Sequence, residues 1–337
     1  MIMKEHSLSD LLSEVETLTA GSWPEIASSL PHDRPAIGFF CPYVPEEILH
    51  AAGALPIRLL DIPVKISHTQ AHLPAYCCHP LKSTLEHYLR GQLDFLQGMV
   101  FSHSCDSMKG LADIWADQGR LSFHFNLMVP SRLDSALSRE FFHSELVRLQ
   151  SALENQLGPI AEENIREAIR LFNRIRERLR ILYARIGAEP GWLSGEMLAR
   201  IIRAGYLMER GKYLDLLTRL FELKREASSD LSSKVPLYLS GNLVQSIDWM
   251  TLIEEAGARV VFDDLCGGGR TLRWTVREDG HPLDALVDRY FSSYFCPTKY
   301  QGLRTHQEVL LKEIRASKAR GVVFIFYKYC EPFYFDY

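Results

Sequence analysis

The chain has 337 residues, of which 47% are hydrophobic and 24% charged, a composition typical of globular proteins and long enough for two or three domains. Its formal net charge of −4 predicts no affinity for nucleic acid or for an anionic membrane surface. The first twenty residues are polar and acidic, unlike a signal peptide, and no apolar run reaches membrane-spanning length, so we expect a cytoplasmic protein.

Residues 1–132 alternate apolar segments with amphipathic ones, a pattern that predicts an N-terminal α/β domain with a mostly parallel sheet. Helices are predicted at 8–18, 45–52, 81–93 and after Cys105. Strands are predicted at 36–40, 55–60, 95–100 and 121–130. Residues 68–80 are irregular and rich in His and Pro.

Residues 133–233 form a predicted helical segment that ends in a polar linker at 228–233. Apolar residues recur at helical spacing over 140–157, 162–186, 194–204 and 210–226. The basic residues within 166–185 are interleaved with glutamates, which indicates a solvated helix face rather than a binding patch.

Residues 234–337 repeat the strand–helix–strand pattern and predict a second α/β domain. Its strands are expected at 237–241, 258–264 and 321–327, and its helices before Glu255 and at 301–316. No helix follows the final strand, so we expect this domain to be truncated. The predicted fold class is α/β, with two Rossmann- or flavodoxin-like parallel-sheet domains joined by the helical segment.

The seven cysteines are an odd number spread along the chain, and without an export signal they favour reduced thiols over a disulfide framework. Cys105 lies in a strand-to-helix turn, where ligands collect in open α/β sheets and where a helix N-terminus favours the thiolate. Cys330 follows another strand, and Cys78 lies in the irregular segment. If the two domains face each other, these thiols converge on the cleft as metal ligands; the alternative is that they are buried or incidental.

Five motifs carry a resemblance to a known family. They are Cys-Pro-Tyr-Val-Pro-Glu-Glu and its continuation at 41–59, Ser-His-Ser-Cys-Asp at 102–106, Tyr-Leu-Ser-Gly-Asn at 238–242, Val-Val-Phe-Asp-Asp-Leu-Cys-Gly-Gly-Gly-Arg at 260–270, and Lys-Tyr-Cys-Glu-Pro with Asp-Tyr at 328–337. In this order the chain resembles the iron–sulfur subunits of the 2-hydroxyacyl-CoA dehydratase and benzoyl-CoA reductase family, over nearly its whole length. It departs from the family in reading Cys-His-Pro for Cys-Pro at the first ligand and in lacking the segment after Asp-Tyr.

The resemblance implies an iron–sulfur cluster, expected to be [4Fe-4S], bound by Cys78, Cys105 and Cys330, with Cys77 as the rival first ligand. It implies an acyl-CoA substrate, a homologous sister subunit in a heterodimer or homodimer, and a separate ATP-hydrolysing iron–sulfur activator. Consistent with a separate activator, the chain has no Gly-x-x-x-x-Gly-Lys-Ser/Thr loop.

The implied reaction is dehydration of a 2-hydroxyacyl-CoA to the enoyl-CoA through a one-electron ketyl radical. The alternatives are ring reduction of an aryl-CoA and a non-catalytic accessory or electron-carrying role. Glu47 is a candidate acid/base group or a residue favouring a helix N-terminus, and His103 is a candidate hydrogen-bond donor or an exposed turn residue. Asp263 and Asp264 are expected to cap the turn before Cys266 rather than contact acyl-CoA.

Overall fold

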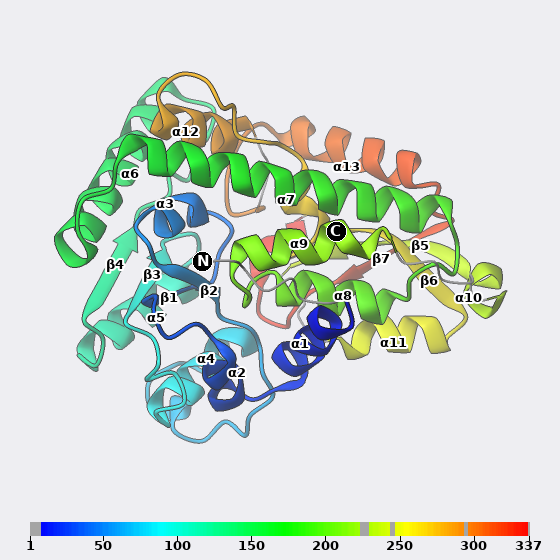
Figure 1. Ribbon diagram of the computed structural model, residues 1–337, viewed down its shortest axis with the longest axis horizontal. Helices are drawn as coiled ribbons and strands as arrows, with labels where there is room; N and C mark the ends of the chain where they lie inside the picture. The colour runs from blue at the N-terminus through cyan, green and yellow to red at the C-terminus, as the bar shows by residue number, and fades with distance from the viewer. Residues whose placement is uncertain (1–7, 223–228, 243–246, 293–295, 336–337) are drawn as a thin grey trace.

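The computed structural model describes residues 8–222, 229–242, 247–292 and 296–335. It contains two parallel sheets, of four and three strands, flanked by helices and joined by a helical segment (Figure 1). This confirms the predicted fold class. None of the helices in the described ranges is long and apolar enough to cross a membrane.

The first sheet is fully parallel and has the strand order β2-β1-β3-β4. Its strands are β1 (Ala36–Phe39), β2 (Leu55–Arg58), β3 (Gly98–Ser102) and β4 (Phe123–Leu127). The strand order reverses between β1 and β3, and such a reversal opens a crevice at the carboxyl ends of the strands. Strand β3 begins later than the predicted residue 95, because Phe95 and the residues just before it form a turn and Gly98 is the first residue paired with β1 and β4.

The helices around this sheet, with the four strands, form what we call the first unit (residues 8–127). They are α1 (Leu8–Ala20), α2 (Trp23–Ser29), α3 (Glu46–Ala51), α4 (His79–Leu89) and α5 (Asp106–Asp117), with a short 3₁₀ helix, η1 (Thr69–Ala71). Helix α2 was not predicted, although Ser22 and Glu25 form a capping box at its start. Helix α4 begins two residues before the predicted start, which places Cys78 at its N-cap.

The helical segment spans both sheets. It contains α6 (Ala136–Leu157), α7 (Glu162–Ala188), α8 (Gly195–Ala204), α9 (Arg210–Leu220) and α10 (Ser229–Ser233), the last of which occupies the predicted linker. Helix α7 runs along the molecule from the side of β3 and β4 to the side of β5 and β6 (Figure 1) and contacts α3, α9 and β6. One helix therefore supports both units.

The second unit (residues 235–264 and 303–335) is built on a parallel sheet of order β6-β5-β7. Its elements are β5 (Val235–Gly241), α11 (Asp248–Glu255), β6 (Ala258–Asp264), α13 (Leu303–Ser317), β7 (Gly321–Ile325) and η3 (Glu331–Phe335). Between β6 and α13 the chain forms η2 (Gly269–Leu272) and α12 (Pro282–Ser292). Helix α12 was not predicted, and it packs on α6 and α7. The predicted helical residues 223–226 and the Asp-Tyr motif at 336–337 lie outside the described residues.

Candidate functional site

Cysteines follow strands in both sheets. Cys41 and Cys105 come shortly after β1 and β3, the two strands at the reversal of order in the first sheet. Cys266 and Cys330 come shortly after β6 and β7 in the second sheet. Because the strands of each sheet are parallel, both pairs of cysteines lie at the carboxyl edge of their sheet, the edge where ligands bind in open α/β folds.

The structure brings Cys78, Cys105 and Cys330 within electrostatic range of one another. Cys78 and Cys105 are the N-cap residues of α4 and α5, and Cys330 lies in the loop before η3. A hydrogen bond donated to Cys77 raises the pKa of the Cys78 thiol, burial raises it further, and the charges that Cys77, Cys105 and Cys330 would carry when ionised add to the shift. The three segments that carry these cysteines therefore meet at one place.

At Cys105, burial and the helix N-terminus shift the pKa of the thiol in opposite directions. The backbone N–H of Met108 lowers the pKa of the thiol, as expected at this position, but burial outweighs it and raises the pKa to about 11. The hydrogen bond from Cys78 instead lowers the pKa of Cys77 to about 6. The pKa of Cys78 responds to both Cys105 and Cys330, and the pKa of Cys105 responds to Cys77, so both adjacent thiols lie near Cys105.

Three further thiols lie next to this group. Burial raises the pKa of Cys266 and of Cys296 to about 12, and each also responds to the charge of Cys41. Cys41 in turn raises the pKa of Cys105. Cys41, Cys266 and Cys296 therefore neighbour one another, and Cys41 also neighbours the first group through Cys105.

The donor set fits an iron–sulfur cluster. All seven cysteines are free, and thiolates are the ligands that iron–sulfur clusters take. Among the described residues, the one trio of His, Cys, Asp or Glu ligand atoms lying within 4.8 Å of one another is His143, His281 and Asp284, which includes no cysteine. The thiols of Cys78, Cys105 and Cys330 are thus spaced more widely than the ligands of a single ion.

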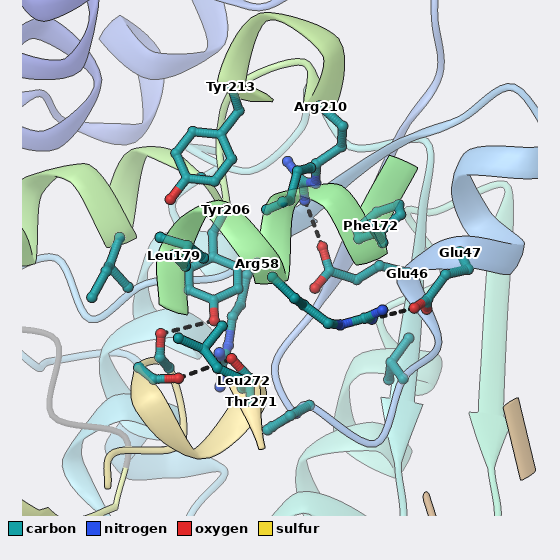
Figure 2. A pocket seen from close by; sticks show the side chains of 18 of the residues that line it. Glu46, Glu47, Arg58, Phe172, Leu179, Tyr206, Arg210, Tyr213, Thr271 and Leu272 are labelled. Atoms are coloured by element: carbon teal, nitrogen blue, oxygen red, sulfur yellow. Dashed lines mark hydrogen bonds and ion pairs between the residues drawn. The ribbon is translucent and has the colours of Figure 1, made fainter. Parts of the chain in front are cut away.

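Figure 2 shows a pocket of about 730 Å³, including its open mouth, whose lining contains none of the cysteines. Pro42 and Gly267, the residues after Cys41 and Cys266, form part of its wall. The rest of the lining comes from the start of α3, from α7, from the α8–α9 connection, and from η2 and α12. The pocket therefore borders elements from both sheets and from the helical segment.

Paired charges line one side of the pocket. Glu46 accepts a hydrogen bond from Arg210 at 2.6 Å, and Glu47 is bonded to Arg176 (Figure 2). Burial alone would raise the pKa of Glu47, but the charges of Arg176 and Arg289 outweigh it and lower the pKa. Glu47 is thus an anion at neutral pH, able to accept a proton or hydrogen bond but not to donate one.

Arg176 corrects the expectation of a solvated helix face over residues 166–185. Its side chain is 9% exposed and faces the pocket. The signal that sequence analysis missed is its spacing: Arg176 lies four residues after Phe172 and three before Leu179, on the buried stripe of α7.

Arg58 joins the two sides of the cleft. Its Nε donates to the carbonyl oxygen of Phe40 at 2.7 Å, and its Nη1 donates to that of Cys266 at 3.1 Å. Its buried Nη2 has no hydrogen-bond partner among the described residues, and its guanidinium lies 4.6 Å from the centroid of the Tyr206 ring. Tyr206 Oη donates to the carbonyl oxygen of Gly267 at 2.8 Å. The two side chains fix the 266–268 turn against the first unit.

Asp263 shapes the same turn, as expected. Its Oδ1 accepts from the backbone N–H groups of Leu265 and Gly269, at 3.1 and 3.0 Å. A Cβ on Gly268 would overlap this carboxylate, so glycine is required there. Asp264 turns instead to Arg270 and Arg273.

His103 lies between β3 and Cys105. Its backbone N–H donates to the carbonyl oxygen of Leu127 at 2.8 Å. Its Nε2 is buried and has no hydrogen-bond partner among the residues that the structure describes. The side chain is therefore not an exposed turn residue, the alternative that sequence analysis left open. Its buried Nε2 belongs to a residue two positions before Cys105.

The fold and the site define a class of protein: two parallel α/β units whose facing strand ends bear thiols, and a charged pocket that borders elements from both sheets. Residues 41–337 match the family described as 2-hydroxyglutaryl-CoA dehydratase, D-component, and the chain belongs to this family.

Individual relatives are more distant. The chain is 25% identical over 304 residues to the (R)-phenyllactyl-CoA dehydratase beta subunit of Clostridium sporogenes, a match that covers 90% of this chain and 81% of that protein. It is 25% identical over 331 residues to a benzoyl-CoA reductase subunit of Thauera aromatica, covering 96% and 84%. It is 22% identical over 337 residues to the (R)-2-hydroxyglutaryl-CoA dehydratase beta subunit of Acidaminococcus fermentans, covering 97% and 88%.

Proposed function

We propose that the chain is the iron–sulfur subunit of an ATP-activated 2-hydroxyacyl-CoA dehydratase, which removes water from a 2-hydroxyacyl-CoA to give the enoyl-CoA. The observation that carries this proposal is the meeting of Cys78, Cys105 and Cys330, which come from both units. A charged pocket bordered by Pro42 and Gly267, the residues after Cys41 and Cys266, provides room for a substrate. Relatives that are dehydratase subunits support the reaction class.

In this proposal Cys78, Cys105 and Cys330 hold a [4Fe-4S] cluster. When bound, the cluster supplies single electrons at low potential. Cys78 is preferred over Cys77 because it is the N-cap residue of α4, as Cys105 is of α5. His103, whose buried Nε2 has no partner in the described part of the chain, is positioned to hydrogen-bond substrate or cluster sulfide.

The pocket is proposed to hold the acyl thioester. Arg58, whose buried Nη2 has no hydrogen-bond partner among the described residues, provides a donor at the wall nearest Cys266, and buried arginines favour negative charge that develops on a substrate oxygen. Glu47 stays ionised because of Arg176, so its role is to accept a proton or to orient a hydroxyl group. The apolar parts of α7 exclude water from the same space.

The partners proposed are an acyl-CoA, a homologous sister subunit and an ATP-hydrolysing iron–sulfur activator. The printed names of the phenyllactyl-CoA and 2-hydroxyglutaryl-CoA relatives describe beta subunits, which supports assembly with a sister chain.

Two alternatives have support of their own. The relative that belongs to a benzoyl-CoA reductase supports ring reduction of an aryl-CoA on the same scaffold. The second group of thiols, Cys41, Cys266 and Cys296, supports an electron-carrying role, because it provides further thiolate ligands next to the first group.

The first test measures the iron and acid-labile sulfide content and records an electron paramagnetic resonance (EPR) spectrum. The protein is purified without oxygen together with its sister subunit. Cys78→Ala, Cys105→Ala and Cys330→Ala should each lose the cluster signal. Ser104→Ala, which changes the same turn as Cys105 without removing a thiol, is the matched control. Full iron content in all three cysteine variants would refute the ligand assignment.

A second test separates the functions. Calorimetry should detect binding of a 2-hydroxyacyl-CoA to the loaded complex, that is, the chain with its sister subunit and its cluster. Arg58→Gln should weaken this binding at least tenfold, because it removes donors at the pocket wall. Tighter binding of an aryl-CoA would favour the reductase. An electron-carrying role would be favoured if the wild type bound no acyl-CoA and the Cys266→Ala variant contained less iron than the wild type.

A further inference from the structure

Asp61 lies just beyond β2, between two segments that carry candidate cluster ligands and come from different units. One is the start of α4, where Cys78 is the N-cap residue. The other is the loop after β7, which leads to Cys330. Sequence analysis singled out neither Asp61 nor its partners.

The carboxylate contacts both segments at once. Its Oδ1 accepts from Ser83 Oγ at 2.6 Å, and its Oδ2 accepts from Tyr327 Oη at 2.7 Å. His79 Nδ1, on the residue after Cys78, is 3.3 Å from the carboxylate. The side chain of Asp61 is 11% exposed, so these contacts are formed largely out of water.

On the second unit, Tyr327 is tied to the backbone of the cysteine itself. The N–H of Cys330 donates to the carbonyl oxygen of Tyr327 at 3.1 Å, closing a turn. The N–H of Tyr327 is 3.4 Å from Oδ1 of Asn242, at the end of β5. A displacement of the Tyr327 ring would therefore be transmitted to the turn that bears Cys330.

When the ligands of a cluster come from two units, the distance between those ligands must be fixed. If the residues around the ligands do not fix it, the site binds the cluster more weakly. The hydroxyl of Tyr327 reaches across 266 residues of sequence to Asp61, whereas the Ser83 bond stays within the first unit. The Asp61–Tyr327 hydrogen bond thus links the Cys78 segment to the loop that leads to Cys330, and the Ser83 bond orients the carboxylate.

We propose that Asp61 is a positioning residue for the thiol site, holding the Cys78 and Cys330 segments in register across the two units through Ser83 and Tyr327. The inference rests on the proposed function, in that Cys78 and Cys330 are taken as ligands of the cluster. Asp61 touches neither the thiols nor the substrate in this role.

The test compares four variants of the loaded complex purified without oxygen: Asp61→Ala, Tyr327→Phe, Ser83→Ala and Tyr238→Phe. Tyr238→Phe is the matched control, because Tyr238 Oη donates to Glu313 at 2.9 Å entirely within the second unit. The readouts are the rate of iron loss to an external chelator, the EPR linewidth, the midpoint potential of the cluster and the Tm.

Asp61→Ala and Tyr327→Phe should lose iron about two- to tenfold faster than wild type, the effect of one net hydrogen bond, with broadened EPR lines. Ser83→Ala should show a smaller change of the same kind, and Tyr238→Phe should match the wild-type spectrum. The double variant Asp61→Ala/Tyr327→Phe should lose iron no faster than Asp61→Ala, because both changes remove the same bond.

Two outcomes overturn the inference, and they are distinguishable. If the wild type holds iron but Asp61→Ala and Tyr327→Phe keep its chelation rate, spectrum and potential while lowering only the Tm, the contact is merely structural. If the wild type holds no iron, the proposed function fails and the positioning role fails with it.

Discussion

The two α/β units share a strand topology but differ in how they are held together. In the first unit, β1, β2 and β3 are buried along their whole length, and large apolar clusters cover both faces of the sheet. In the second unit, β7 is only partly buried, and the fully buried apolar cluster consists of Leu239, Met250, Val260 and Leu265. Hydrophobic burial therefore supports the first unit far more than the second.

Buried polar contacts provide what the second unit lacks in apolar core. Asp264 binds Arg270 and Arg273, and Arg273 also binds Glu313 on α13. Tyr183 on α7 donates a hydrogen bond to Asp263. Such contacts add little net stability but are costly to break one at a time, so they specify one docked arrangement. A site built between the units benefits from that specificity.

The largest effect is expected in the core of the first unit. Trp115 is 1% exposed and stacks on Tyr88 with ring centroids 4.0 Å apart. Trp115→Ala should lower the free energy of unfolding by about 3–5 kcal/mol, measured by urea titration. Leu239→Ala, in the small cluster of the second unit, should cost about 2 kcal/mol, at the low end for a buried leucine. A larger cost for Leu239→Ala would contradict the contrast between the two cores.

The next effect tests the buried charges of the second unit. Asp264→Ala leaves Arg270, which is fully buried, without its carboxylate. We expect a loss of about 3 kcal/mol in the free energy of unfolding. The control is Asp134→Ala, whose partner Arg132 is 67% exposed and whose loss should leave the free energy of unfolding nearly unchanged. Equal costs for the two variants would show that burial of the Asp264 pair is unimportant.

Two glycines at strand pairings offer a smaller, matched comparison. A Cβ at Gly241 in β5 would overlap the backbone carbonyl of Ile325 in β7, whereas a Cβ at Gly38 in β1 would overlap the movable side chain of Met99. Gly241→Ala should cost about 2–3 kcal/mol, and Gly38→Ala about 1 kcal/mol, by the same denaturant titration. The reverse order would mean that the first sheet is the less tolerant of the two.

The smallest effect is a pH dependence at Asp263. Burial raises the pKa of this carboxyl above its ordinary value of 3.8. The folded state then binds its proton more tightly than the unfolded state, so stability falls as the pH rises from about 3.8 through the folded pKa. Asp263→Asn removes that dependence. The stability difference between variant and wild type should grow between pH 4 and pH 7; parallel curves would refute the shift.

The local pattern of apolar residues predicted most helices and strands, but it predicted few of the contacts between them. Apolar periodicity indicated α7 and the strands of both sheets, because it depends on which face of each element is buried. Helix α12 was missed, although it buries Leu283, Leu286 and Tyr290 against α6 and α7. Arg176 was taken for a solvated residue, since a buried arginine looks like an exposed one until its partner Glu47 is known.

The sequence by itself determined the fold class, the family motifs and the positions of Cys105 and Cys330 after strands, since these follow from local spacing. Only the tertiary structure decided which side chains meet: that the Cys41, Cys266 and Cys296 thiols form a second group, that arginines from distant elements line one pocket, and that Asp61 reaches Tyr327. The physical reason is that these contacts join residues far apart in the chain, and nothing in local hydrophobicity or propensity encodes a distance between two sheets.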